Sequence, residues 1–271
     1  MDRNKTFLRE IAAKPADNTI RLMYADWLAE MGGGENLALS ELIQLQIHRH
    51  HSLEAEGGKV NQELIQREEE ILSLFGNQWV SNLPLDLDEC RFERGFLSKI
   101  RIEAKALISN LETVFHFHPI EDLELFWGLS PNHHRVSDLQ VILAKSWLRN
   151  IRIFRLSHTS IGSNGAQAIA LAAPKLACLE KLEIDNCHIG DAGLQSLILS
   201  GLLNQLHQVN LSGNYITSKG MGYLVGEMNR IHGNHLPCNL KNLDLRGNRS
   251  GISGLSAIRS SALLRKIVLI D

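Results

Sequence analysis

The residues best suited to metal chemistry form a basic run in the first third of the chain. His48, Arg49, His50 and His51 follow one another, and His48 and His51 would share one face of a helix. Two imidazoles at this spacing could bind zinc, but no Cys, Asp or Glu nearby supplies a clear third ligand. We therefore interpret the run as a solvated helix end, where cationic groups suit the helix dipole, and we predict no metal site and no cofactor.

A second group that could do chemistry lies around Arg21 and Asp26, beside Tyr24 and Trp27. These charges could belong to an active site, but a structural ion pair or cap that holds a small bundle together is the preferred interpretation. Further histidines are assigned to surface or packing roles: His116, His118, His133 and His134. The sequence holds no G-x-S-x-G, H-E-x-x-H, P-loop or dinucleotide fingerprint, so we expect a protein that is not an enzyme.

The elements that would position functional side chains are clearest in the second half, where one phrase of residues recurs. The phrase has the form L-x-x-L-x-L-x-x-N/C-x-I, and its firm copies begin at Ile151, Leu179, Leu206 and Leu240. In each copy, alternate apolar residues indicate a short strand with one side facing a core. A second phrase, apolar-x-x-x-Gly-apolar-x-x-apolar, follows and indicates an amphipathic helix that returns the chain.

This spacing is the signature of leucine-rich repeats, and residues 120–271 resemble repeats of the ribonuclease-inhibitor type. The resemblance implies an α/β fold, namely a leucine-rich-repeat solenoid with a curved parallel sheet inside and helices outside. Weaker copies of the phrase begin at Leu97, Ile120 and Leu264, which brings the array to about seven strands.

The turn after each strand carries an Asn or a Cys. Asn214 and Asn248 are expected to be buried and to bond to backbone groups that the turn leaves unpaired, one copy above the next. Cys187 stands in the same position, as is typical of the ribonuclease-inhibitor-like subclass. We therefore predict that these residues contribute to stability rather than to binding.

The first third of the chain differs, because up to about residue 84 it shows helical periodicity and no strand pattern. Glycines at positions 32–34 and 57–58 interrupt the periodicity. The pattern predicts about four helices packed as a small all-α bundle.

This segment also resembles a known family. Residues 7–102 are similar to the short repeat-companion domain that precedes repeats in many planctomycete and some other bacterial proteins. The most specific part is R-L-x-Y-A-D-W-L at residues 21–28, and the similarity continues through E-L-I-Q-L-Q at 41–46 and R-G-F at 94–96. The resemblance implies a bacterial protein, but no established activity comes with it.

Length and composition agree with a two-domain chain of 271 residues. We expect a helical repeat-companion domain at residues 1–84, acting as an N-terminal cap, and a leucine-rich-repeat domain at residues 85–271. The net charge of -2 argues against a nucleic-acid partner. No apolar run is long enough to span a membrane, no signal peptide is evident, and the four cysteines fit no metal motif, so a cytoplasmic protein with reduced thiols is expected.

The concave face of the predicted sheet is the better candidate for function. Its side chains mix charge with one aromatic end, as protein or peptide interfaces often do. The predicted binding residues are Glu124, Phe126, Trp127, Arg155, His158, Glu183, Asp185, Asn210, Asp244 and Arg246. Their centre column reads Glu124, Arg155, Glu183, Asn210, Asp244. A plain solvated sheet face remains an alternative, as does packing of Phe126 and Trp127 under the helical bundle.

Open repeats offer a long surface and little enclosed volume, so the predicted function is a non-catalytic scaffold that binds a protein or peptide, with no nucleic acid and no membrane as partner. Two alternatives remain at this point. One is an accessory or regulatory subunit that presents a peptide substrate to a separate enzyme. The other is an enzyme with a site at the junction of the helical domain and the first repeats, using residues such as Asp26, His116, His118 or Trp127.

Overall fold

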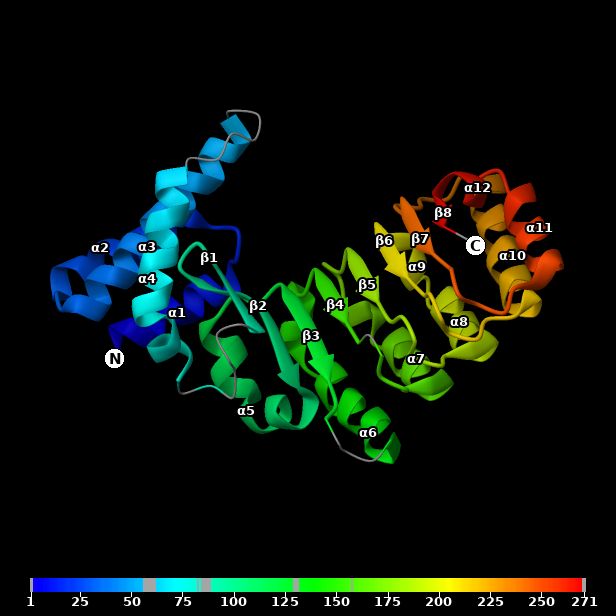
Figure 1. The fold of residues 1–271 in the computed structure, drawn as a ribbon, viewed down its shortest axis with the longest axis horizontal. Helices are drawn as coiled ribbons and strands as arrows, with labels where there is room; N and C mark the ends of the chain where they lie inside the picture. Colours follow the sequence, from blue (N-terminus) through cyan, green and yellow to red (C-terminus); the bar gives the residue numbers. More distant parts are fainter. Residues whose placement is uncertain are drawn as a thin grey trace. The chain divides into compact units, whose positions relative to one another are not determined.

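The chain divides into two compact units. The computed structural model describes residues 2–55, 62–81, 83, 89–128, 132–156 and 158–269 (Figure 1). The first unit comprises Met1–Ile102 and Ser109–Asp122, and the second comprises Glu103–Ile108 and Leu123–Asp271. The boundary expected after residue 84 lies outside the described residues and stays a prediction.

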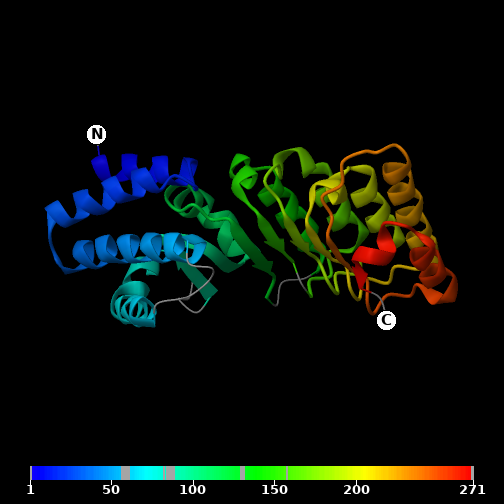
Figure 2. The ribbon, with the colours of Figure 1, turned by 90° about the horizontal axis from the view of Figure 1, so that it is seen from above.

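Unit 1 begins with helices that start and end at the signals its sequence carries. They are α1 (Arg3–Ala13), α2 (Asn18–Met31), α3 (Gly34–Ala55) and α4 (Gln62–Val80), coloured blue to cyan in Figures 1 and 2. The Asp2 carboxylate accepts a hydrogen bond from the backbone N–H of Lys5, and the Asp17 carboxylate accepts one from Thr19, so both caps satisfy otherwise unpaired helix donors. Gly32 ends α2 with a φ of 67°, a left-handed conformation that favours glycine.

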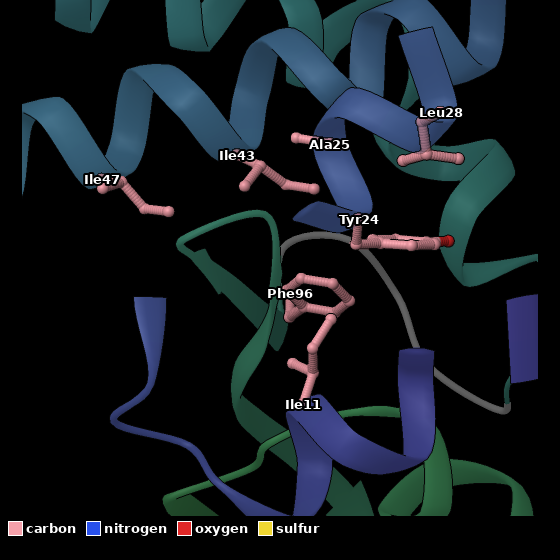
Figure 3. Packing of buried hydrophobic residues seen from close by; sticks show 7 residues of the cluster. All are labelled: Ile11, Tyr24, Ala25, Leu28, Ile43, Ile47 and Phe96. Carbon is pink, nitrogen blue, oxygen red and sulfur yellow. The ribbon is translucent and has the colours of Figure 1, made fainter. Parts of the chain in front are cut away.

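A β-hairpin completes the core of unit 1. Strands β1 (Cys90–Glu93) and β2 (Phe96–Glu103) are antiparallel and are joined by Arg94 and Gly95. Figure 3 shows that Phe96 lies among apolar side chains from α1, α2 and α3, with its ring centroid 5.9 Å from that of Tyr24. The buried cluster consists of Ile11, Tyr24, Ala25, Leu28, Ile43, Ile47 and Phe96. The helices and the hairpin therefore share one hydrophobic core.

Helix α5 (Ala104–Phe117) contributes residues to both units. The elements that follow it belong to unit 2, except that the first residue of β3 is counted in unit 1. In chain order the others are β3 (Asp122–Phe126), α6 (Asn132–Leu143), η2 (Ser146–Asn150), β4 (Ile153–Arg155), α7 (Gly162–Leu171), η3 (Ala173–Lys175), β5 (Lys181–Glu183), α8 (Gly190–Leu199), α9 (Leu202–Gln205), β6 (Gln208–Asn210), α10 (Ser218–Gly233), β7 (Asn242–Asp244), α11 (Gly251–Ser260), α12 (Leu264–Ile267) and β8 (Val268–Leu269). The repeat phrase predicted strands at the positions that β2 to β8 occupy, except that Leu264 and Ile267 lie in the short helix α12.

Strands β4 to β8 form a parallel sheet in which each strand neighbours the next one along the chain. The central residue of each strand from β4 to β7 points into the core, because Phe154, Leu182 and Leu243 are fully buried and Val209 is nearly so. Helices α7, α8, α10 and α11 follow one another in the same order as the strands and cover that side (Figure 1). The two flanking residues of each strand therefore lie on the opposite side of the sheet.

The hydrogen bonds predicted for the turn asparagines are present, and the predicted burial is confirmed for Asn214 and Cys187, whereas Asn248 is half-buried. Asn214 is completely buried, and its amide makes hydrogen bonds to the backbone of two consecutive repeats. Its Oδ1 accepts from the N–H groups of Cys187 and Ile189 at 3.0 and 3.4 Å, and its Nδ2 donates to the carbonyls of Ile184 and Ser212 at 2.7 and 3.2 Å. Each turn is thus hydrogen-bonded to the turn of the preceding repeat.

The equivalent residues of the neighbouring repeats act in the same way. The Oδ1 of Asn248 accepts from the N–H groups of Asn214 and Ile216, both at 3.0 Å. Cys187 donates its thiol hydrogen to the carbonyl of Leu156 at 2.9 Å. The pKa of the Cys187 thiol is raised to about 11, mainly by burial. The thiol is therefore neutral at pH 7 and acts as a hydrogen-bond donor within the fold.

Candidate binding surface

The candidate surface is the side of the sheet that the helices do not cover, which we call the sheet face. Its residues form two columns across β4 to β7, because the strands pair in exact register. One column contains Ile153, Lys181, Gln208 and Asn242, and the other contains Arg155, Glu183, Asn210 and Asp244. The predicted order of the centre column from Arg155 to Asp244 is therefore confirmed.

Glu183 is held between two cations on this face. Its Oε2 lies 2.6 Å from the Nε of Arg155 on β4, and its Oε1 lies 2.6 Å from the Nζ of Lys181 on β5. The side chains of Arg155 and Glu183 are 17% and 20% exposed, so the pair is partly shielded from solvent. Arg152 and Glu180 make a similar but more exposed pair just before these strands, at 2.7 Å. The cross-strand ion pairs fix the positions of long side chains that would otherwise be mobile.

Asp185 anchors the next group, at the carboxyl ends of the strands. Its carboxylate accepts from the amide nitrogens of Asn186 and Asn210 at 3.2 and 3.4 Å and lies 3.4 Å from Nε2 of His158. The Asn210 Oδ1 in turn accepts from the backbone N–H and hydroxyl of Ser212 at 3.0 and 2.8 Å. This network joins three consecutive repeats through polar side chains.

Asp244 and Arg246 form the last charged group of the surface. The guanidinium of Arg246 donates to both carboxylate oxygens of Asp244, with the shortest distance 2.6 Å. This hydrogen bonding lowers the pKa of the Asp244 carboxyl below its ordinary value, so the group is ionised at neutral pH. The Arg246 side chain remains 56% exposed, which leaves part of its surface open to a partner.

The surface is hollowed between the ion pairs. A depression of about 200 Å³ lies over β5 to β8, and it is lined by Lys181, Glu183, Gln208, Val209, Asn210, Asn242, Asp244 and Leu269. Most of its walls are polar side chains of the two columns, and the exposed Leu269 adds an apolar end. Lys181 and Asn242 were not among the residues predicted for binding, although the alternation that indicates Glu183 and Asp244 also places them on this face.

One predicted surface residue lies elsewhere. Trp127 is buried, with 7% of its surface exposed, and its indole N–H donates to Asp138 of α6 at 3.1 Å. The prediction was wrong because Trp127 follows the end of β3, where the strict alternation of sides no longer applies. Glu124 and Phe126 lie on β3 and are half-buried.

Arg21 and Asp26 of unit 1, which the sequence offered as candidates for chemistry, are not arranged as an active site. Arg21 is buried, donates to the backbone carbonyl of Asp17 at 3.1 Å and lies over the ring of Phe96. Burial lowers the pKa of this guanidinium to about 10, with the charge of Arg94 as a further cause. Asp26 is exposed, and no ion pair joins it to Arg21 in the part of the chain that the structure describes. Of the two roles expected, ion pair or cap, the contact of Arg21 with the N-cap residue Asp17 is closer to the second.

The histidines that the structure describes show no arrangement suited to a metal. His48, His50 and His51 are exposed on α3, and within the described ranges no group of three or more His, Cys, Asp or Glu side chains could hold a metal ion. Burial lowers the pKa of His118 to about 4, so its ring is neutral near pH 7. His116 and His134 lie at the surface, and the side chain of His133 lies outside the described residues.

Comparison with protein families supports the repeat assignment for part of unit 2. Residues 148–170 and 175–197 match the family model described as Leucine Rich repeat. These segments contain β4 with most of α7 and β5 with most of α8. This part of the chain is similar to leucine-rich repeats. No curated protein is similar enough to the chain to count as a match. Among the described helices, none is both long and apolar enough to cross a membrane.

Proposed function

We propose that unit 2 is a leucine-rich-repeat solenoid that binds a protein or peptide along the sheet face, without catalysing a reaction. The observation that carries the proposal is the column Arg155, Glu183, Asn210 and Asp244, which the strand register places side by side. Leucine-rich repeats commonly mediate protein binding, and extended repeat surfaces suit a partner that lies along them. The proposed contact residues are Glu124, Phe126, Arg155, His158, Glu183, Asp185, Asn210, Asp244 and Arg246.

The paired charges support recognition by complementarity. Since Glu183 lies between Arg155 and Lys181, and Asp244 lies against Arg246, a ligand along the columns meets alternating charge rather than a field of one sign. Ion pairs that exist before binding hold their side chains in place, which reduces the entropy that association costs. Such a surface favours a partner with its own polar and charged groups in matching order.

Two further proposals rest on the sequence. We propose that unit 1 contains a repeat-companion domain of bacterial type and that its helices cap the solenoid. We also propose a cytoplasmic location for the protein.

The test of binding uses neutral variants of the acidic residues on the sheet face. The partner is first isolated by affinity capture from the native host, and calorimetry then measures its affinity for Glu183→Gln/Asp185→Asn. We expect affinity to fall by about tenfold or more and its salt dependence to change, because charge complementarity is lost. Isosteric amides keep the side-chain volume and avoid placing a third cation beside Arg155 and Lys181.

The matched control is Glu227→Gln on α10. Glu227 is also paired with an arginine, Arg230, at 2.7 Å, and its side chain is 19% exposed, close to the value for Glu183. We expect this control to keep the wild-type affinity. Equal affinities for wild type and the sheet-face variant, together with a loss at Glu227, would assign binding to the helical side instead.

A further inference from the structure

A row of stacked side chains runs along the edge of the sheet where the strands end. It consists of His188, Tyr215 and Arg249, one from the turn after each of β5, β6 and β7, and we call it the rim stack. The rings of His188 and Tyr215 are 4.8 Å apart and nearly parallel, and the guanidinium carbon of Arg249 lies 4.2 Å from the centre of the Tyr215 ring. These distances match the spacing of about 4.8 Å between strands, because each side chain occupies the same position in its repeat.

The turn asparagines Asn214 and Asn248 hold the rim stack in place. The Oδ1 of Asn214 binds the backbone N–H groups on either side of His188, and the Oδ1 of Asn248 binds those on either side of Tyr215. His188 and Tyr215 both have left-handed backbones, with φ values of 59° and 60°. This conformation is unfavourable for residues with a side chain, and it persists only where the surroundings impose it. All three side chains are nevertheless exposed to solvent.

Arg249 differs from the arginines on the sheet face. Arg152, Arg155 and Arg246 each form an ion pair with a carboxylate. Within the described residues, the Arg249 side chain has no hydrogen bond or ion pair, and its contact is the face of Tyr215. A guanidinium stacked on a ring keeps its N–H groups pointing outward in its own plane, in the fork that fits a carboxylate through two parallel hydrogen bonds.

We propose that Arg249, held by Tyr215 and His188, is an anchor for a carboxylate on an acidic peptide segment of a protein partner. This inference rests on the proposed function in that the partner is a protein or peptide, and it adds a site at the edge of the sheet. A carboxylate fits better than a phosphate, because one unpaired guanidinium matches one negative charge.

The experiment measures the binding of a defined probe to the full chain. The probe is a fluorescein-labelled hexapeptide of alternating glutamate and glycine with a capped C-terminus, and its counterpart has glutamine in place of glutamate. Fluorescence anisotropy should show that the wild type binds the glutamate peptide about fivefold or more tighter than the glutamine peptide. Arg249→Gln should abolish this difference, and Arg249→Lys should retain less than half of it, since lysine keeps the charge and loses the fork.

Lys219→Gln is the matched control. Lys219 is also an exposed cation over a tyrosine ring, with its Nζ 5.8 Å from the centre of Tyr223, and its removal changes the net charge by the same amount. It should bind both peptides as the wild type does, and all variants should keep the wild-type melting temperature. The proposal is overturned if Arg249→Gln still prefers the glutamate peptide, or if Lys219→Gln loses the preference equally.

Two further measurements distinguish the Arg249 proposal from a phosphate-binding site and from the sheet-face proposal. A peptide with phosphoserine in place of glutamate should bind no tighter than the glutamate peptide, and tighter binding would overturn the assignment to a carboxylate. The variant Glu183→Gln/Asp185→Asn should keep the preference for the glutamate peptide. If it does so and also binds the native partner as the wild type does, the sheet-face proposal fails while the Arg249 anchor stands.

Discussion

At the scale of single residues, the buried amide of Asn214 makes hydrogen bonds that no apolar side chain could make. It provides partners for two backbone N–H groups and two carbonyls in a turn from which water is excluded. Buried peptide groups without a partner are costly, so one short side chain decides whether consecutive turns can stack. The same bonds hold the rim residues in place, which connects the stability of the repeat to the surface it presents.

We expect Asn214→Ala to lower the free energy of unfolding by about 1–3 kcal/mol, because its backbone partners lose their hydrogen bonds without gaining water. Denaturant unfolding followed by circular dichroism measures the change. Asn242→Ala is the control, since Asn242 is exposed on the sheet face, and it should change stability by less than about 0.5 kcal/mol. Equal stabilities of the two variants would contradict the structural role of the turn asparagine.

At the scale of elements, the glycine of the helix phrase has a packing role. A Cβ on Gly193 of α8 would lie 2.7 Å from Cβ of Ile189 and 2.9 Å from Cβ of Ala166 on α7. Gly165 and Gly220 stand at the same position in their repeats and are equally crowded by the apolar residue four positions earlier. The recurring glycine therefore makes room for the apolar residue four positions earlier, and in α8 also for the neighbouring helix α7.

Replacing each of two helical glycines by alanine should change the stability of unit 2 in opposite directions. Gly193→Ala should destabilise unit 2 by about 1–3 kcal/mol, because the added methyl group forces α7 and α8 apart. Gly222→Ala on α10 meets nothing within 4 Å and should stabilise the helix by about 0.5–1 kcal/mol, since alanine has the better helix propensity. Thermal melting of both variants checks the prediction, and destabilisation by both would show that close packing is not the reason for the glycine.

In unit 1, Gln46 is the polar link between a helix and the hairpin. Its Oε1 accepts from the backbone N–H of Gly95 at 2.7 Å, and its Nε2 donates to the carbonyl of Phe92 at 3.1 Å and to Glu68 at 2.6 Å. Gly95 has a φ of 82°, and a side chain there would collide with Ile43. Residues 41–46 and 94–96, which are far apart in the sequence, are thus joined by a direct hydrogen bond.

Gln46→Ala should destabilise unit 1 by about 2–4 kcal/mol, because two buried backbone groups of the hairpin lose their partners at once. Hydrogen exchange of the Gly95 amide is the most direct readout, and it should accelerate in the variant. The control Gln66→Ala removes an exposed glutamine on α4 whose hydrogen bond to Glu70 is long, at 3.5 Å. Protection of Gly95 that is the same in both variants would exclude the proposed link.

At the scale of the whole molecule, unit 1 shows that the helices and the first hairpin depend on each other. Phe92 and Phe96 are 6% and 2% exposed, and they are covered by Trp79 of α4 and Tyr24 of α2. The hairpin strands would present these rings to water without the helices, and exposed apolar patches on strands promote aggregation.

We therefore expect a fragment that begins at Leu83 to aggregate or to be poorly soluble. Size-exclusion chromatography and thermal melting, applied to this fragment and to the full chain, test this expectation. Replacing Phe92 and Phe96 by serine in the fragment should partly restore solubility, because it removes the exposed rings. A fragment that is monomeric and melts cooperatively would mean that the strands are stable without the helices and would end the capping proposal.

Much of the fold could be predicted from local spacing. The period-two alternation gave the strand positions and the side of the sheet on which Arg155, Glu183, Asn210 and Asp244 lie, because the pleat repeats every two residues wherever a strand is regular. The hydrogen bonds of the Asn and Cys positions could be predicted, because only a side chain with both donor and acceptor groups satisfies the turn between repeats, although Asn248 is half-buried rather than buried.

The tertiary structure alone decided which groups pair across the repeats. The predicted column placed Glu183 beside Arg155, but whether their side chains form an ion pair, and whether Tyr215 stacks on both His188 and Arg249, depends on the packing of residues some 27 to 34 positions apart. Trp127 was misplaced for a related reason, since strand alternation stops at the end of β3. There the backbone path and the nearest buried partner determine where a side chain goes, and neither is encoded in the local pattern.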